Sequence, residues 1–168
     1  MKYLSRVIVA VFATLCVWSA AVAASGTAAD AVMVQEAYVR AVPPGQPNSA
    51  AFMTLMNKSG SDHSVVGGES PVAKVVELHE HIHQNGMMKM RQIPRIDVKA
   101  NGKTVLQPGG LHVMLIGLKQ ELKKGEKVSL TLKFDDGSTK TVEAPVRSVI
   151  GGMKMKGMGG MKKGMGGM

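Results

Sequence analysis

Histidine and methionine, two residues whose side chains bind transition metals, lie close together in the middle of this 168-residue chain. Residues 111–115 read LHVML, so apolar and donor side chains alternate. Alternate residues of a β-strand share a face. His112 and Met114 would then stand side by side, near enough for one ion to bind an imidazole nitrogen and a thioether sulfur. Two further runs carry the same donor types: residues 76–79 read VELH, and residues 87–90 read MMKM.

The use of methionine favours a soft ion of low charge. Thioether sulfur suits Cu(I), has little use for Mg, Ca or Mn, and is not among the usual zinc ligands. The chain has fourteen Met but a single Cys, Cys16. If Cys16 is removed with a leader, the mature chain has no thiolate, which excludes a blue-copper electron carrier. Thioethers also fit an oxidising compartment because they cannot form disulfides.

Each of these residues also has a purely structural interpretation. A methionine at strand spacing usually fills the core, and we assign Met53 and Met56 to that class. We assign His63, which lies in a polar stretch, to a solvated loop. Taken alone, the pair of His112 and Met114 fits metal binding and structural packing equally well.

The ends of the chain differ from its middle. Residues 1–23 have the features of a cleaved signal peptide: Lys2 and Arg6, an apolar run over 7–17 that is too short to span a bilayer well, and AVA at 21–23. We therefore expect export and no stable membrane insertion after cleavage. A lipid anchor on Cys16 is not expected, because Leu15 stands where a lipoprotein signal has a small residue.

Residues 151–168 contain eight Gly, six Met and four Lys and nothing else. This composition cannot build a packed core, so we predict a disordered tail. Its thioethers are spaced so that neighbours can converge on one soft ion, and they are predicted weak copper ligands: Met153, Met155, Met158, Met161, Met165 and Met168. A plain disordered terminus, or lysines that attract an acidic partner or a membrane surface, stay open as alternatives.

The formal net charge of +9 is mostly terminal, since six of the basic residues lie in the leader and the tail and leave +3 for the middle. Aromatic residues make up only 4% of the chain. With neither a basic face nor stacking platforms, nucleic-acid binding is not expected.

The middle of the chain, residues 24–150, is predicted to be one all-β domain. Short alternating or apolar runs recur between turn residues, which is typical of a Greek-key β-sandwich or barrel. The predicted strands cover 32–42, 50–57, 64–66, 73–81, 87–93, 105–106, 111–115, 127–134 and 139–144. A helix over 71–79 is the main local alternative.

Four donors then stand at fixed long spacings: His79, ten residues, Met90, twenty-one residues, His112, one residue, Met114. This spacing resembles the signature of the PCu(A)C family of periplasmic copper chaperones, and the resemblance covers roughly residues 32–146. The flanking sequences NSAAFM at 48–53, GMMKMR at 86–91 and PGGLHVML at 108–115 are similar to the family as well.

The resemblance implies a cupredoxin-like β-barrel that binds Cu(I) through His79, Met90, His112 and Met114 at an accessible site. It also implies delivery of copper, chiefly to the CuA centre in subunit II of cytochrome c oxidase, often alongside a Sco-type thioredoxin-like protein. The chain departs from the simplest pattern at His81 and His83. These imidazoles, with Met88, are predicted auxiliary ligands, and the two histidines are candidates for Cu(II) capture.

We therefore expect a periplasmic, non-enzymatic Cu(I) chaperone. Copper storage or detoxification, with the tail as a reservoir, is the alternative among binding proteins. A copper-dependent oxidase or oxygenase is the alternative among enzymes. The sequence opposes it, because it has no Ser–His–Asp or Cys–His set, no second metal cluster and no plausible carboxylate pair.

Overall fold

The computed structural model describes residues 26–84 and 86–148. The predicted signal peptide, 1–23, and the predicted tail, 151–168, lie outside the described residues. The described chain contains a short helix and ten strands: α1 (Ala28–Ala31), β1 (Val32–Arg40), β2 (Asn48–Asn57), β3 (His63–Glu69), β4 (Ala73–Gln84), β5 (Met87–Gln92), β6 (Ile96–Val98), β7 (Lys103–Leu106), β8 (His112–Leu118), β9 (Lys127–Phe134) and β10 (Thr139–Arg147). The predicted all-β architecture is confirmed.

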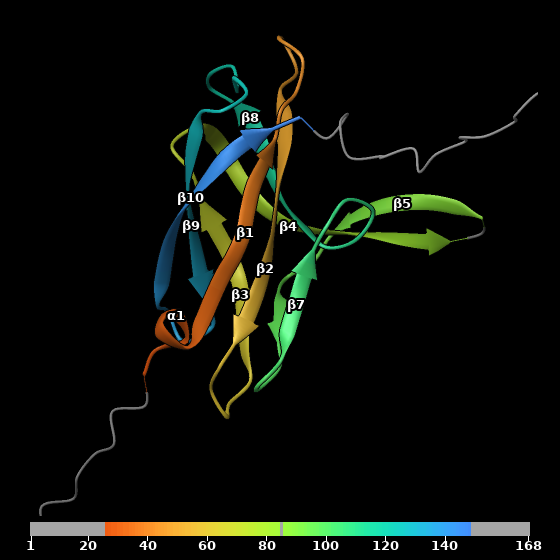
Figure 1. Ribbon diagram of the computed structural model, residues 1–168. Coiled ribbons are helices and arrows are strands. Elements are labelled where there is room, and N and C mark those ends of the chain that lie inside the picture. Colours follow the sequence, from red (N-terminus) through yellow and green to blue (C-terminus); the bar gives the residue numbers. More distant parts are fainter. Residues whose placement is uncertain (1–25, 85, 149–168) are drawn as a thin grey trace, which may run out of the picture.

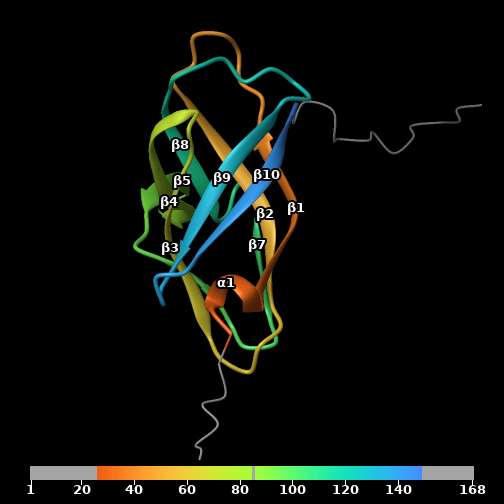
Figure 2. The same ribbon diagram turned by 90° about the vertical axis from the view of Figure 1, so that its left-hand side faces the viewer.

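The strands follow the order β5-β4-β8-β2-β1-β10-β9-β3-β6, and β7 pairs with β2. Neighbouring strands are antiparallel except β1 and β10, which run parallel and join the two halves of the sheet at the register Val39↔Val146. Figures 1 and 2 show β9 and β10 on one side of the molecule and β2, β8 and β4 on the other. The sheet thus curls into two facing layers.

Alternation of residue type decides which side of each strand is buried. In β9 every second residue is buried, namely Val128, Leu130, Leu132 and Phe134. In β8 Val113 and Leu115 are fully buried. These residues belong to one hydrophobic cluster that draws on both layers. Because the core lies between the layers, the alternate residues of β4 and β8 face outward.

All nine predicted strands are present, with most boundaries shifted by a few residues. The alternative helix over 71–79 is wrong, because β4 begins at Ala73 and pairs along its length with β8 and β5. The sequence analysis missed β6 and α1, both of which are very short. His63 is the first residue of β3 and half-buried, with Nε2 3.1 Å from Oγ of Ser59, so its assignment to a loop is wrong.

The core assignment of Met53 is confirmed, since its side chain is 2% exposed. Met56 is half-buried and lies opposite Met33 in the pairing of β1 with β2. Neither residue lines the cavity described below.

The β4–β5 hairpin projects from the body of the sandwich (Figure 1). All six residues of β5 are exposed, and β5 is an edge strand. Within residues 26–84 and 86–148, no helix has the length and apolar character needed to cross a bilayer.

Candidate metal centre

Three neighbouring strands bring the predicted donors onto one surface. The pairing of β4 with β8 sets His79 opposite His112 and Glu77 opposite Met114. Directly opposed residues in an antiparallel pair project to the same face of the sheet. The face that carries His112 and Met114 is therefore shared by His79, as the alternation of residues 111–115 predicted.

The pairing of β4 with β5 adds the remaining donors. His81 lies opposite Met90, and His83 lies opposite Met88, one step further along the hairpin. The seven His and Met side chains of this domain that were predicted as main or auxiliary ligands thus share the outer face of three adjacent strands. They differ in depth, since His112 is 2% exposed whereas Met88 and Met90 are 50% and 47% exposed.

His112 is the centre of this arrangement. Its Nδ1 lies 3.0 Å from the carbonyl oxygen of Gly110, and its Nε2 lies 3.2 Å from Sδ of Met90. A carbonyl oxygen can only accept, so Nδ1 carries the proton, and in the neutral ring Nε2 then has a lone pair. A thioether sulfur also has only lone pairs to offer. Two electron-pair donors therefore face each other across 3.2 Å, a geometry suited to sharing a soft cation.

Burial favours the neutral form of His112. Desolvation lowers the pKa of His112 below its ordinary value, and the nearby His81 and His79 lower it further when charged, against the opposing effect of the hydrogen bond to Gly110. The ring packs beside Phe52 with centroids 6.2 Å apart, and Phe52 packs on Tyr38 at 5.3 Å. A neutral imidazole is the form that binds a metal, so this apolar surrounding favours loading.

A tight turn supplies the carbonyl that orients His112. The amide of Gly110 donates to the carbonyl of Gln107 at 3.0 Å, and between them Pro108 is followed by Gly109 at φ +82°. Proline then glycine at positive φ is the pattern of a type II turn, in which an L side chain at the second central position would be strained. The turn aims the carbonyl of Gly110 at His112, and the same oxygen accepts from the backbone N–H of His81 at 3.2 Å.

His79 is held by a carboxylate. Its Nε2 lies 2.8 Å from Oε2 of Glu77, and both side chains are partly buried. The carboxylate can only accept this hydrogen bond, so Nε2 carries the proton. In the neutral ring Nδ1 then has a lone pair that is free to bind a metal. That Nδ1 is buried and has no hydrogen-bond partner. A carboxylate that fixes the tautomer of a metal-binding histidine is a common outer-shell arrangement.

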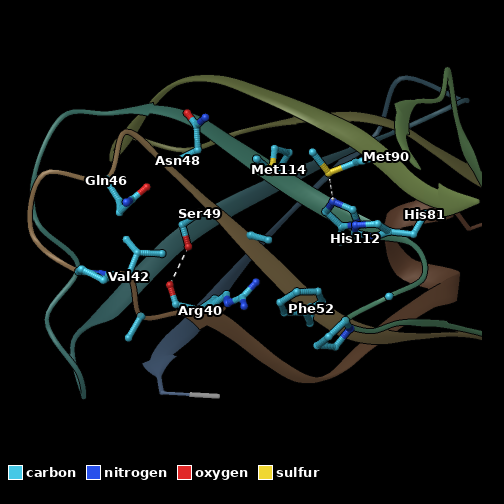
Figure 3. A pocket seen from close by; sticks show the side chains of 15 residues that line it. Arg40, Val42, Gln46, Asn48, Ser49, Phe52, His81, Met90, His112 and Met114 are labelled. Carbon is cyan, nitrogen blue, oxygen red and sulfur yellow. Dashed lines mark hydrogen bonds between the residues drawn. The ribbon is translucent and has the colours of Figure 1, made fainter. Parts of the chain in front are cut away.

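A surface cavity of about 460 Å³ opens beside these donors. Figure 3 shows Met90, Met114, His112 and His81 at one end of it and Asn48 and Gln46 at the other. The lining residues are Arg40, Ala41, Val42, Pro43, Gln46, Asn48, Ser49, Ala50, Phe52, His81, Met90, Pro108, Gly109, His112 and Met114. Three of the four predicted main ligands line the cavity, and His79 is outside the lining with its ring centroid 5.8 Å from that of His112.

The structure separates the auxiliary candidates. His81 lines the cavity and stacks on His112, with centroids 5.0 Å apart and planes at 28°. His83 is exposed and does not line it. Met88 is also outside the lining, although its methyl carbon lies near Gly109. The predicted tail ligands, such as Met153, lie outside the described residues.

Two residues with clear roles were missed in the sequence. Glu77 orients His79, and Gly110 orients His112 through its carbonyl. The spacing of Glu77 two residues before His79 on a strand, which places both on one face, was the signal that could have found it. Nothing in the sequence marks a particular backbone carbonyl.

Within residues 26–84 and 86–148, no three His, Cys, Asp or Glu side chains are grouped closely enough to hold a metal ion. An imidazole or carboxylate site of the kind that zinc prefers is therefore not formed by the described residues. The described donors make a centre only when the thioethers are included. A separate Cu(II) site at His81 and His83 stays a prediction.

Comparison with known proteins places this geometry in a family. Residues 32–146 match the family model described as "LpqE-like: Putative lipoprotein LpqE-like". A protein of Leifsonia xyli subsp. xyli named "Putative lipoprotein Lxx21020" is 39% identical over 127 residues, which is 75% of each chain.

Solved structures share the fold. The solution structure of Cu(I)-DR1885 from Deinococcus radiodurans has a TM-score of 0.61 and 44% identity, over 75% of this chain and 85% of DR1885. The copper-bound PCuAC domain from PmoF2 also has a TM-score of 0.61, with 20% identity, over 73% of this chain and 97% of that domain. The predicted cupredoxin-like fold is thereby confirmed, and the chain belongs to the LpqE-like family and is a PCu(A)C-family protein.

Proposed function

We propose that this protein is a periplasmic metallochaperone that binds Cu(I) with His79, Met90, His112 and Met114 and passes it to another protein. The observation that carries the proposal is the approach of Nε2 of His112 to Sδ of Met90, at 3.2 Å. Both atoms present lone pairs once the ring is neutral, and burial favours the neutral ring. Imidazole and thioether together select a soft monovalent ion over zinc or magnesium.

The relatives support copper as the cargo. DR1885, the solved relative at 44% identity, was determined in a Cu(I) form, and the PmoF2 domain was determined with copper bound. Because this chain carries His79, Met90, His112 and Met114 on one face of the same fold, we infer that it binds the same element.

The position of the site favours transfer over permanent storage. Met90 is 47% exposed and stands on an edge strand, whereas His112 is buried. An incoming ligand from an acceptor can displace the exposed thioether first, while the buried imidazole still holds the ion. Neutral donors also hold Cu(I) without strong Coulombic attraction, so stepwise exchange has no large charge barrier.

The acceptor we propose is the CuA centre of cytochrome c oxidase subunit II, reached directly or together with a Sco-type thioredoxin-like protein. Storage or detoxification of periplasmic copper is the second candidate, and the methionine-rich tail favours it. We propose no enzymatic activity. The proposal of export rests on residues 1–23, and relatives named as lipoproteins support an exported protein.

The tail enters the proposal as a collecting arm. The last described strand ends at Arg147, whose carbonyl accepts from the amide of Ala41 at 2.8 Å. Ala41 lines the cavity. Strand β10 therefore ends beside the cavity wall, and we propose that the thioethers after it collect Cu(I) for the site.

Transfer of Cu(I) to candidate acceptors tests the function. Loaded protein is mixed with apo subunit II domain or apo Sco-type protein, the two are separated, and copper is measured in each. We expect copper to appear in the acceptor faster than from a small-molecule Cu(I) complex of equal affinity. Equal rates from both sources would favour storage, and failure of the protein to bind Cu(I) would overturn the proposal.

A further inference from the structure

Two buried side-chain nitrogens of the described chain have no hydrogen-bond partner, and both belong to this site. They are Nδ1 of His79 and Nδ1 of His81. Buried polar atoms are nearly always paired, because an unpaired one loses its hydration without compensation. A pair of orphaned imidazole nitrogens on one strand, beside two thioethers and a third imidazole, therefore points to a missing partner.

The two histidines have different surroundings. His79 is anchored outside the cavity lining, since its Nε2 lies 2.8 Å from Oε2 of Glu77 and its ring does not line the opening. His81 lines the cavity and lies opposite Met90 in the β4–β5 pairing. Figure 3 shows His81 beside His112, at the same end of the cavity as Met90.

A single carbonyl sets the position of His81 relative to His112. The oxygen of Gly110 accepts from the backbone N–H of His81 at 3.2 Å and from Nδ1 of His112 at 3.0 Å. The two rings stack with centroids 5.0 Å apart, closer than the 5.8 Å between His79 and His112. His81 is thus the nearer of the two β4 imidazoles to the ring that faces Met90.

We propose that His81 is a fifth ligand of the same centre, which replaces His79 when the ion moves toward the cavity. This inference rests on the proposed function. In the deep position His79 completes the set with Met90, His112 and Met114, and in the outer position His81 takes its place. The exchange is a substitution of one neutral imidazole by another, so the oxidation state of copper and the charge of the site do not change.

Such an exchange has a functional consequence. An ion on His81 lies at the cavity wall, where an acceptor's ligand can enter, whereas His79 is only 12% exposed and does not line the cavity. His81 would then set the rate of release more than the affinity. His63 offers a comparison, because it is a half-buried imidazole on β3 that does not line the cavity.

The test uses the full chain and Cu(I) as the probe. In the wild type, the Nδ1 resonance of His81 in a ¹H–¹⁵N imidazole spectrum should shift on addition of one equivalent of Cu(I). His81→Ala should slow transfer to an acceptor by about 10-fold or more with a smaller change in affinity. The double variant His79→Ala/His81→Ala should bind Cu(I) more weakly, by at least about 10-fold, than the combined losses of the two single variants predict. The reason is that each imidazole can replace the other in the single variants.

His63→Ala is the control and should match the wild type in the shift of the His81 resonance, the transfer rate and the Cu(I) affinity. If the wild type binds Cu(I) tightly but the His81 resonance does not move and His81→Ala transfers at the wild-type rate, His81 is not a ligand and only this inference fails. If the wild type does not bind Cu(I), the proposed function fails and this inference with it.

Discussion

Nε2 of His112 and Sδ of Met90 meet at 3.2 Å, although their residues lie on strands that do not pair with each other. Strand β4 lies between β8 and β5, and the two donors approach each other over its outer face, which also carries His79 and His81. Because neither atom has a proton to give when the ring is neutral, the contact is best completed by a cation.

Loss of a thioether should weaken Cu(I) binding without loss of fold. Met90→Leu and Met114→Leu keep the bulk of the side chain and remove the sulfur. In a chain that ends at Ile150, each should lower Cu(I) affinity by more than the roughly 10–100-fold that loss of an outer-shell partner costs, and His112→Ala should do the same. Competition with a Cu(I) chelator measures the effect.

Met87→Leu is the control for these variants, since Met87 is 59% exposed on β5 and projects to the opposite face from Met90. It should bind as the wild type does. Full Cu(I) affinity in both Met114→Leu and His112→Ala would refute the ligand assignment.

Removal of the carboxylate behind His79 should weaken the site indirectly. Glu77→Ala frees the ring of His79 to rotate and makes its nitrogen a poorer donor, so we expect a loss of about 10–100-fold in Cu(I) affinity. Glu80→Ala is matched for burial, because the two side chains are 27% and 25% exposed, but Glu80 pairs with Arg91. Equal losses in the two variants would mean that Glu77 has no specific role.

The tail should add weak Cu(I) sites and should speed the loading of the main site with Cu(I). A chain ending at Ile150 should keep one tight Cu(I) site and lose the further, weaker equivalents in a competition titration. It should also load more slowly at low free Cu(I). A tail that is disordered, as its composition predicts, must lose conformational entropy to bind, so it should hold copper weakly enough to release it to the main site. Equal stoichiometry and equal loading rates for the two chains would rule out a collecting arm.

The two faces of β8 should respond oppositely to substitution. Leu115 is fully buried in the core, so Leu115→Ala should lower the free energy of unfolding by about 2–5 kcal/mol. Met114→Leu should change it by less than about 1.5 kcal/mol while it impairs copper binding. Urea unfolding of the apo proteins measures both, and a large stability loss in Met114→Leu would assign its sulfur to packing.

Asp136 should make stability depend on acid pH. Its carboxylate accepts from the amide of Ala28 at 2.7 Å and from the hydroxyl and amide of Ser138, and these bonds lower its pKa from 3.8 to about 2. A lowered pKa stabilises the fold when the group is ionised, so the contribution is present above about pH 4 and is lost as the pH falls toward 2.

Asp136→Ala should therefore be less stable than the wild type at pH 7, and the difference should shrink below pH 4. Asp135→Ala is the control in the same turn, because the Asp135 side chain makes no hydrogen bond within the described part of the chain. A difference between wild type and Asp136→Ala that is constant from pH 7 to pH 2 would contradict the assignment.

Much of the fold followed from local pattern. The eight residues of β9 alternate between core and surface, and the predicted and observed limits agree because this period decides burial. The same argument placed His112 and Met114 on one face. Short elements escaped it: β6 has three residues, and α1 has four and depends on the capping box of Thr27 and Asp30. In so short a segment the hydrophobic period of a strand cannot be distinguished from that of a helix.

The donor types and the alternation of residues 111–115 were determined by the sequence alone, because chemical softness and strand period are properties of the residues themselves. Which imidazoles converge was decided only by the tertiary structure. The register between β4 and β5 sets His81 opposite Met90, and the turn at Gly110 ties it to His112. Strand register depends on pairing between segments that are distant in the sequence, and the direction of a single carbonyl depends on the turn that holds it. A local pattern of side chains predicts neither.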